Sequence, residues 1–210
     1  MKRLGIALMG AFLLAGCGSV RYPSYYVLNF PPAPQAKPSN GDLGPVAIRE
    51  FECPEYLCGD RIAYRPGSEE VGFYEYHRWA MNPSEAITKY VAEALRAQSL
   101  FRSVAAHEHG ADTAYVLIGN IERFEELDEG RDVRAICTIS ARLLDTETKS
   151  VVWSHTASET VQVDKHDVRG VVSSLSSAAR AASDRLVQSM AEELPARVMD
   201  ANHMRAQRRS

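Results

Sequence analysis

The strictest pattern in the chain is a two-residue alternation of apolar and polar side chains over residues 133–144. The apolar set is Val133, Ala135, Cys137, Ile139, Ala141 and Leu143, and the outward set is Arg134, Ile136, Thr138, Ser140, Arg142 and Leu144. Successive side chains of a strand point to opposite faces, so the pattern predicts a long strand with one face on a core. Residues 114–127 and 151–163 are also strand-like, and turns at Glu129-Gly130 and at 145–149 join them to it. Three long antiparallel strands are therefore expected in succession.

Two amphipathic helices are predicted, one before and one after these strands in the sequence. The first begins at Asn82-Pro83, because Asn is a favourable N-cap and Pro fits the first helical position. The second covers about 167–194, and Pro195 predicts an end or a kink. Its apolar stripe consists of Val168, Val172, Leu175, Ala179, Ala182, Leu186, Met190 and Leu194.

Shorter strand candidates occupy residues 24–30, 45–51, 61–65, 71–76 and 100–105. With the helices they predict an α+β fold: a two-layer, largely antiparallel sheet with two helices packed on one face. One domain over residues 24–196 is expected.

The polar, basic tail at 197–210 has two interpretations. It is either a frayed end or an arm that touches anionic lipid.

The first 16 residues have the pattern of a lipoprotein signal peptide. Lys2 and Arg3 precede an apolar run that is too short to span a membrane. Leu14-Ala15-Gly16-Cys17 then resembles a bacterial lipobox, in which the Cys thiol accepts lipid; the alternative is an ordinary signal peptide with a chance Cys. We expect Cys17 to anchor the mature chain at the periplasmic side of the bacterial envelope, with residues 17–23 as a short tether.

The residues after Cys17 bear on which membrane holds the chain. Gly18-Ser19 follow it instead of the Asp that retains such lipoproteins in the inner membrane, which favours the outer membrane.

The remaining three cysteines are expected in two different chemical states. Cys53 and Cys58 have a C-x4-C spacing, and an oxidising periplasm favours a disulfide over two free thiols. A metal site would need further ligands, which no neighbouring motif provides. Cys137 belongs to the apolar set of its strand, so an inert buried thiol is expected.

Catalytic motifs are absent from the sequence. There is no G-x-S-x-G elbow, Walker A loop, G-x-G-x-x-G or H-E-x-x-H. His107-Glu108-His109 follows a strand at a polar turn, which favours a surface loop over a metal site. Ser154 and His155 are adjacent on a strand and therefore face opposite ways. The expectation is a protein that is not an enzyme and needs no cofactor. Its formal net charge of −3 is not the basic charge that is typical of nucleic-acid-binding proteins.

Aromatic residues crowd the first half of the chain. Eight of the nine Tyr lie in the first 90 residues, and Phe73, Tyr74, Tyr76, His77 and Trp79 fall within seven positions. They either fill the core or form an amphipathic contact surface for a protein or a lipid.

Four motifs in order resemble a known family. After the lipobox come Tyr25-Tyr26-Val27-Leu28, Gly44-Pro45-Val46, Arg61–Arg65 with Glu70–Tyr74, and Arg78-Trp79-Ala80 before Asn82-Pro83. This order is similar to the ABC-type transport auxiliary lipoproteins, the PqiC-like family. The matching positions, with structural or partner-facing roles implied, are Tyr25, Tyr26, Leu28, Arg65, Trp79 and Pro83. The Cys53/Cys58 pair departs from the usual family pattern.

The resemblance implies a docking or scaffold subunit. Such proteins accompany an ABC permease of the MlaE type with its ATPase and an MCE-type substrate-binding protein, in systems that move lipids or other hydrophobic compounds across the envelope. Homo-oligomerisation is possible in such an assembly. Two alternatives remain open: a periplasmic lipid carrier, and an outer-membrane assembly or secretion accessory lipoprotein.

Overall fold

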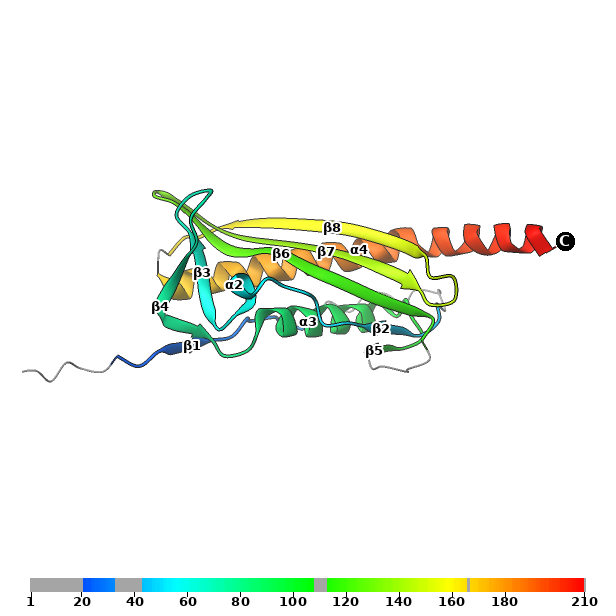
Figure 1. The fold of residues 1–210 in the computed structure, drawn as a ribbon, viewed down its shortest axis with the longest axis horizontal. Helices are drawn as coiled ribbons and strands as arrows, with labels where there is room; N and C mark the ends of the chain where they lie inside the picture. The colour runs from blue at the N-terminus through cyan, green and yellow to red at the C-terminus, as the bar shows by residue number, and fades with distance from the viewer. Residues whose placement is uncertain (1–20, 33–42, 108–112, 166, 210) are drawn as a thin grey trace, which may run out of the picture.

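Three long antiparallel strands run along the long axis of the molecule, which confirms the interpretation of the alternation (Figure 1). The computed structural model describes residues 21–32, 43–107, 113–165 and 167–209. The long strands are β6 (Tyr115–Glu129), β7 (Asp132–Asp145) and β8 (Val151–Gln162). β7 pairs with β6 on one side and with β8 on the other.

Two short parallel strands share the other edge of β6. β2 (Val46–Ile48) pairs with its start and β3 (Arg61–Arg65) with its end. Beyond β2 lies β5 (Val104–Ala106), and beyond β3 lies the antiparallel β4 (Gly72–Trp79), with β1 (Ser24–Tyr26) parallel to β4 at the rim. The eight-stranded sheet is thus antiparallel along its long ladders and parallel in short ones, in agreement with the predicted fold class.

Two helices, α3 (Pro83–Gln98) and α4 (Val168–Arg209), lie side by side (Figure 1). Of these, α4 packs against the long strands, while α3 packs against α4 and β5. Both helices begin at a side-chain cap, since the side chain of Asn82, the predicted cap, accepts a backbone N–H at 2.8 Å and that of Asp167 accepts one at 2.7 Å. The caps remove backbone donors that a helix start otherwise leaves unpaired.

Two helical features differ from the prediction. A third helix, α2 (Glu55–Cys58), lies between β2 and β3; its four residues are too few to produce a helical period in the sequence. The last helix does not end at Pro195 but continues to Arg209, so residues 197–209 are helical rather than frayed. An ion pair from Arg197 to Glu193 at 2.6 Å spans the turn that contains Pro195 and supports the helix there.

One hydrophobic core joins the sheet to both helices. Trp153 of β8 and Leu186 of α4 are fully buried between the two layers. All members of this core lie between Tyr26 and Val198, so the chain after residue 17 contains the whole described core. None of the described helices combines the length and apolar character that a membrane crossing requires.

Candidate partner-facing site at the β1–β4 edge

The parallel pairing of β1 with β4 brings together motif residues that are distant in sequence. Tyr25 is paired with Arg78, and Tyr26 with Trp79. Sequence reasoning selected Tyr25, Tyr26 and Trp79 separately, and the structure places them on two adjacent strands at one edge of the sheet. The edge is next to the point where the N-terminal tether enters the fold (Figure 1).

Behind this edge, four rings form a continuous Tyr/His cluster, defined as Tyr26, Tyr64, Tyr74 and His77. The Tyr26 hydroxyl lies 3.0 Å from His77 Nδ1, in hydrogen-bond contact. The Tyr74 ring meets His77 edge-on at 5.9 Å between centroids and lies 5.2 Å from the Tyr64 ring. The cluster therefore links β1, β4 and β3 through side chains as well as through backbone pairing.

The Tyr/His cluster ends on a buried carboxylate. The Tyr74 hydroxyl donates a hydrogen bond of 2.6 Å to Glu126, a β6 residue that is 5% exposed. Burial, and then the bond to Glu126, raise the pKa of Tyr74 well above its ordinary value, so its proton stays in place. Sequence reasoning missed Glu126. A signal was present in the adjacent acids Glu125 and Glu126, because two neighbours on a strand point to opposite faces; in the structure both are buried, at 1% and 5% exposure.

Most of the family-motif residues face inward. Trp79 is 5% exposed and its ring lies 5.7 Å from that of Phe124. Its indole N–H has no hydrogen-bond partner in the described part of the chain. Leu28 packs against the core, and Pro83 is buried at the first position of α3. These positions support the fold of the edge from within.

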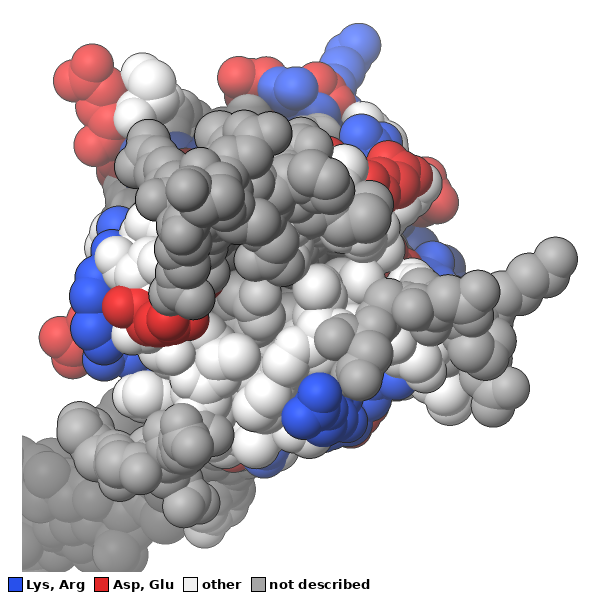
Figure 2. Space-filling view, turned by 90° about the vertical axis from the view of Figure 1, so that its right-hand side faces the viewer, with Lys and Arg blue, Asp and Glu red and all other residues white. Residues whose placement is uncertain are grey.

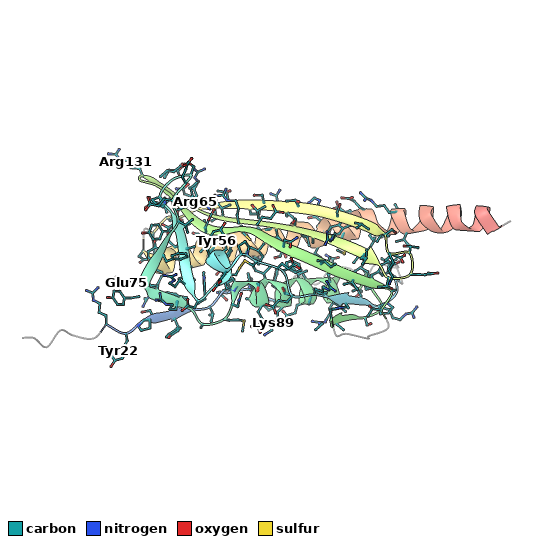
Figure 3. All side chains as sticks on the ribbon, viewed as in Figure 1. Tyr22, Tyr56, Arg65, Glu75, Lys89 and Arg131 are labelled. Atoms are coloured by element: carbon teal, nitrogen blue, oxygen red, sulfur yellow. A yellow bond between two sulfur atoms is a disulfide. The ribbon has the colours of Figure 1, made fainter. Side chains whose placement is uncertain are left out.

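Tyr25 is the motif residue that points outward. It is 66% exposed, next to Tyr22 at 83% and Val27 at 59%. From Tyr25 to Phe30 exposed and partly buried residues alternate, so one side of this extended segment faces out. Figure 3 shows Tyr22 pointing away from the fold below β1.

Arg65 does not join this site. It lies at the far end of β3, away from Tyr22 (Figure 3), where its Nε is 3.1 Å from a carboxylate oxygen of Glu125. Arg123 approaches the other oxygen at 2.8 Å, so a carboxylate that is 2% exposed lies between two guanidinium groups. Removal of either partner of a buried ion pair lowers stability strongly, so the contact with Glu125 indicates a structural role for Arg65.

The two cysteines before β3 are joined. The Sγ atoms of Cys53 and Cys58 lie at bonding distance, with their Cα atoms 6.0 Å apart, and α2 occupies the loop between them. Leu57 in this loop is buried, whereas Tyr56 beside it is 41% exposed (Figure 3). Cys17, Glu108 and His109 lie outside the described residues.

The candidate chemical groups are separated or shielded. Ser154 and His155 are paired with Arg142 and Ala141 and so point to opposite faces of β8. The Cys137 thiol is buried, and this burial raises its pKa, which disfavours the reactive thiolate. Among the described residues, no group of three or more His, Cys, Asp or Glu side chains is arranged to hold a metal ion.

Comparison with known proteins identifies a family by a sequence model and a shared fold by solved structures. The family model for the ABC-type transport auxiliary lipoprotein component matches residues 26–191. No curated protein matches the chain.

Solved structures share the fold at low sequence identity. A Xanthomonas campestris protein of the DUF330 family is 21% identical, with a TM-score of 0.69, covering 81% of this chain and 96% of that one. An uncharacterised protein is 15% identical, with a TM-score of 0.63 and coverages of 80% and 99%. A hypothetical protein from Chlamydia trachomatis is 9% identical, with a TM-score of 0.52 and coverages of 73% and 99%.

Proposed function

The chain belongs to the ABC-type transport auxiliary lipoprotein family, and we propose that it is the membrane-anchored docking subunit of a transporter that moves lipids or other hydrophobic compounds across the bacterial envelope. In this proposal its partners are an MlaE-type permease with its ATPase and an MCE-type substrate-binding protein. Cys17 carries the lipid, most consistently in the outer membrane, because Gly18-Ser19 follow it. The domain binds its partners without catalysing a reaction.

The packed interior favours docking over lipid carriage. Trp153, Leu186 and Met190 are all fully buried and fill the space between the long strands and α4, where a carrier would hold an acyl chain. The apolar groove between α3 and the β2–β5 edge, of about 250 Å³, lies outside this packed space. This packing is the observation that carries the choice of function.

The arrangement of the two ends suits a tethered docking subunit. The six residues between Cys17 and Ser24 span at most roughly 20 Å, so a lipid on Cys17 would hold the β1 end of the domain close to the membrane. The C-terminal end of α4 projects from the opposite end of the long axis (Figure 1). Seen from that end, the described Lys and Arg residues are interspersed with Asp and Glu (Figure 2). A mixed-charge surface held away from the membrane can form specific polar contacts with a protein partner.

Co-purification from envelope extracts tests this function. The bait is the tagged full chain, and the control is its Cys17→Ser variant, which cannot accept lipid. We expect the ATPase, the permease and the MCE-type protein to be recovered with the lipidated bait and to be reduced with the variant. Recovery of no transporter component with the lipidated bait would contradict the proposal. Recovery of outer-membrane assembly or secretion proteins instead would favour an accessory lipoprotein.

The same preparations test localisation and assembly. Separation of inner from outer membranes on a density gradient should place the lipidated chain in the outer-membrane fraction. Light scattering of the purified complex gives the number of copies of the chain, since homo-oligomerisation stays a prediction.

A further inference from the structure

Beside the point where the tether enters the fold, α4 and the segment after β1 form a groove of about 430 Å³. Val27, Asn29 and Pro31 line one wall, and the other is the face of α4 between Arg169 and Arg180. The backbone N–H of Asn29 donates to the hydroxyl of a buried helix serine at 3.1 Å, which fixes the segment against α4. The groove is therefore part of the folded domain.

Two cations in this groove have no ion-pair partner among the described residues. Arg169 and Arg180 are both exposed, and neither forms an ion pair or a hydrogen bond with any residue in the described ranges. Ser173, Ser176 and Ser177 lie between them on the same helix face, and the hydroxyls of Ser176 and Ser177 donate to backbone carbonyls of α4. The arginines are therefore the groups free to bind an anion, and their guanidinium groups match the chemistry of a phosphate group.

The acidic residues near Arg169 leave this positive character in place. Asp164 and Asp167 lie on the other side of Arg169 together with Lys165. A side-chain oxygen of Asp167 accepts the backbone N–H of Gly170 at the start of α4. The two aspartates line the neighbouring depression and not the groove that contains Arg180.

Exposed aromatic and apolar side chains border the same groove. Val27 belongs both to the groove and to the outward side of the segment that carries Tyr25, and Tyr22 extends from the tether (Figure 3). Tyrosine is favoured at membrane–water interfaces, where its ring meets apolar groups and its hydroxyl meets water. Exposed aromatic and apolar side chains next to arginines without ion pairs are typical of a membrane-contacting surface.

We propose that these five residues, Tyr22, Tyr25, Val27, Arg169 and Arg180, form an anchor-proximal surface that lies on an anionic lipid bilayer. The arginines contact lipid phosphates, and the tyrosines enter the interface. The orientation rests on the proposed function, because a lipid on Cys17 leaves only four residues before Tyr22 and so brings this surface to the membrane. The contact then sets how the domain is presented to its partners, which a flexible tether alone cannot do.

The test is vesicle binding by residues 18–210, which contain the whole described core but have neither the lipid nor the signal peptide. Sedimentation with vesicles of phosphatidylethanolamine and phosphatidylglycerol should recover the protein, whereas phosphatidylcholine vesicles should not. Arg169→Gln with Arg180→Gln should weaken binding by about thirtyfold, since each arginine near an anionic surface contributes about fivefold. Tyr22→Ser with Tyr25→Ser should weaken it by roughly tenfold through lost apolar contact.

Matched variants separate this surface from general charge and hydrophobicity. Arg131→Gln with Arg142→Gln removes the same charge from elsewhere and should leave binding unchanged. Arg131 lies in the β6–β7 turn, away from Tyr22 (Figure 3), and Arg142 is an exposed β7 residue paired with Ser154 of β8. Tyr56→Ser on α2 is the control for the tyrosines. Thermal unfolding followed by circular dichroism identifies variants that have lost the fold, and Arg169→Lys with Arg180→Lys should retain binding because the charge is kept.

Several results would overturn the inference. They are no vesicle binding by the unaltered protein, equal binding to phosphatidylcholine, no loss with Arg169→Gln and Arg180→Gln, or an equal loss with the Arg131 and Arg142 control. This assay needs neither lipidation nor a transporter. A failed co-purification with normal vesicle binding therefore removes the proposed function and leaves the membrane-contacting surface in place.

Discussion

At the residue scale, the two tryptophans occupy buried sites with opposite hydrogen-bond status. The Trp79 indole N–H is unpaired among the described residues, whereas that of Trp153 points to the hydroxyl of Ser189 at 3.4 Å. A buried donor without a partner costs about 1–3 kcal/mol, so its removal offsets part of the lost packing. We therefore expect Trp79→Phe to lower the free energy of unfolding by less than about 1.5 kcal/mol, against about 3–5 kcal/mol for Trp79→Ala.

Urea unfolding of the same variants measures this difference. Trp153→Phe is the matched control, because it removes a similar volume but leaves Ser189 without its indole donor. It should cost more than Trp79→Phe. An equal or larger loss for Trp79→Phe would show that the Trp79 indole N–H is satisfied in solution.

Single residues were predictable where the reason is local. Asn82 and Asp167 cap helices next to themselves, and Cys137 faces the core because its own strand alternates. The bond from Tyr74 to Glu126 was not predictable, because it joins residues 52 positions apart. It depends on the placement of β3 between β4 and β6, which no local pattern encodes.

At the element scale, α4 carries a proline inside a continuous helix. Pro195 has no N–H for the helical hydrogen bond and its ring crowds the preceding turn, which costs about 3 kcal/mol in a helix interior. Proline also restricts the unfolded chain, which returns part of this cost. We expect Pro195→Ala to raise the free energy of unfolding by about 1–2 kcal/mol, as measured by urea unfolding.

Ala196→Pro tests the same element from the neighbouring exposed position. It adds a second proline to the helix and should lower the free energy of unfolding by about 3 kcal/mol or more. A loss of stability with Pro195→Ala would instead mean that the proline shapes the helix to fit the buried Leu194.

The disulfide closes a short loop around α2. Only four residues separate Cys53 from Cys58, and a loop of this size should contribute less than the roughly 3 kcal/mol of a 15-residue loop. Leu57 is 1% exposed and holds α2 against the sheet by packing alone. Cys53→Ser with Cys58→Ser should therefore lower the unfolding midpoint slightly and leave the tryptophan bands of the near-UV circular dichroism unchanged. Loss of the tryptophan bands would show that the bond is required for the local fold.

The long elements were predictable and the short ones less so. The three long strands and both long helices carry a period of two or of 3.6 residues over several repeats. α2 has only four residues, and β5 begins at Val104 rather than at Leu100. Leu100 and Phe101 precede that strand as buried residues, and Phe101 forms only an isolated parallel bridge with Leu43, so their apolar character reflects the core more than a continuous strand.

At the scale of the whole molecule, three proton donors in the sheet and helix layers share one electrostatic property. Burial raises the pKa of Tyr74 in β4, of Tyr90 in α3 and of Cys137 in β7 above their ordinary values. Glu126 and Asp184 add to this effect by accepting hydrogen bonds from the two tyrosines. The native protein keeps these three protons at alkaline pH, when an unfolded chain releases them.

The direction of the pH effect follows from this difference. Ordinary thiols titrate near about pH 8.5 and tyrosines near about pH 10. Below these values both states hold the protons and the stabilising contribution is fully present. Above them the unfolded state binds fewer protons than the native state, so the free energy of unfolding falls as pH rises. We expect this decline between about pH 8 and about pH 11 in urea unfolding.

Tyr74→Phe with Tyr90→Phe should make the alkaline decline shallower, although it lowers stability at every pH because Glu126 and Asp184 each lose a donor. The slope against pH, not the absolute stability, is therefore the quantity to compare. Tyr22→Phe with Tyr25→Phe changes two exposed hydroxyls and should leave the slope unaltered. Equal slopes for all three proteins would mean that the buried tyrosines ionise freely, which the bonds to Glu126 and Asp184 oppose. A shallower slope only in the Tyr74→Phe, Tyr90→Phe protein would show that protonated tyrosines in both the sheet layer and the helix layer stabilise the fold.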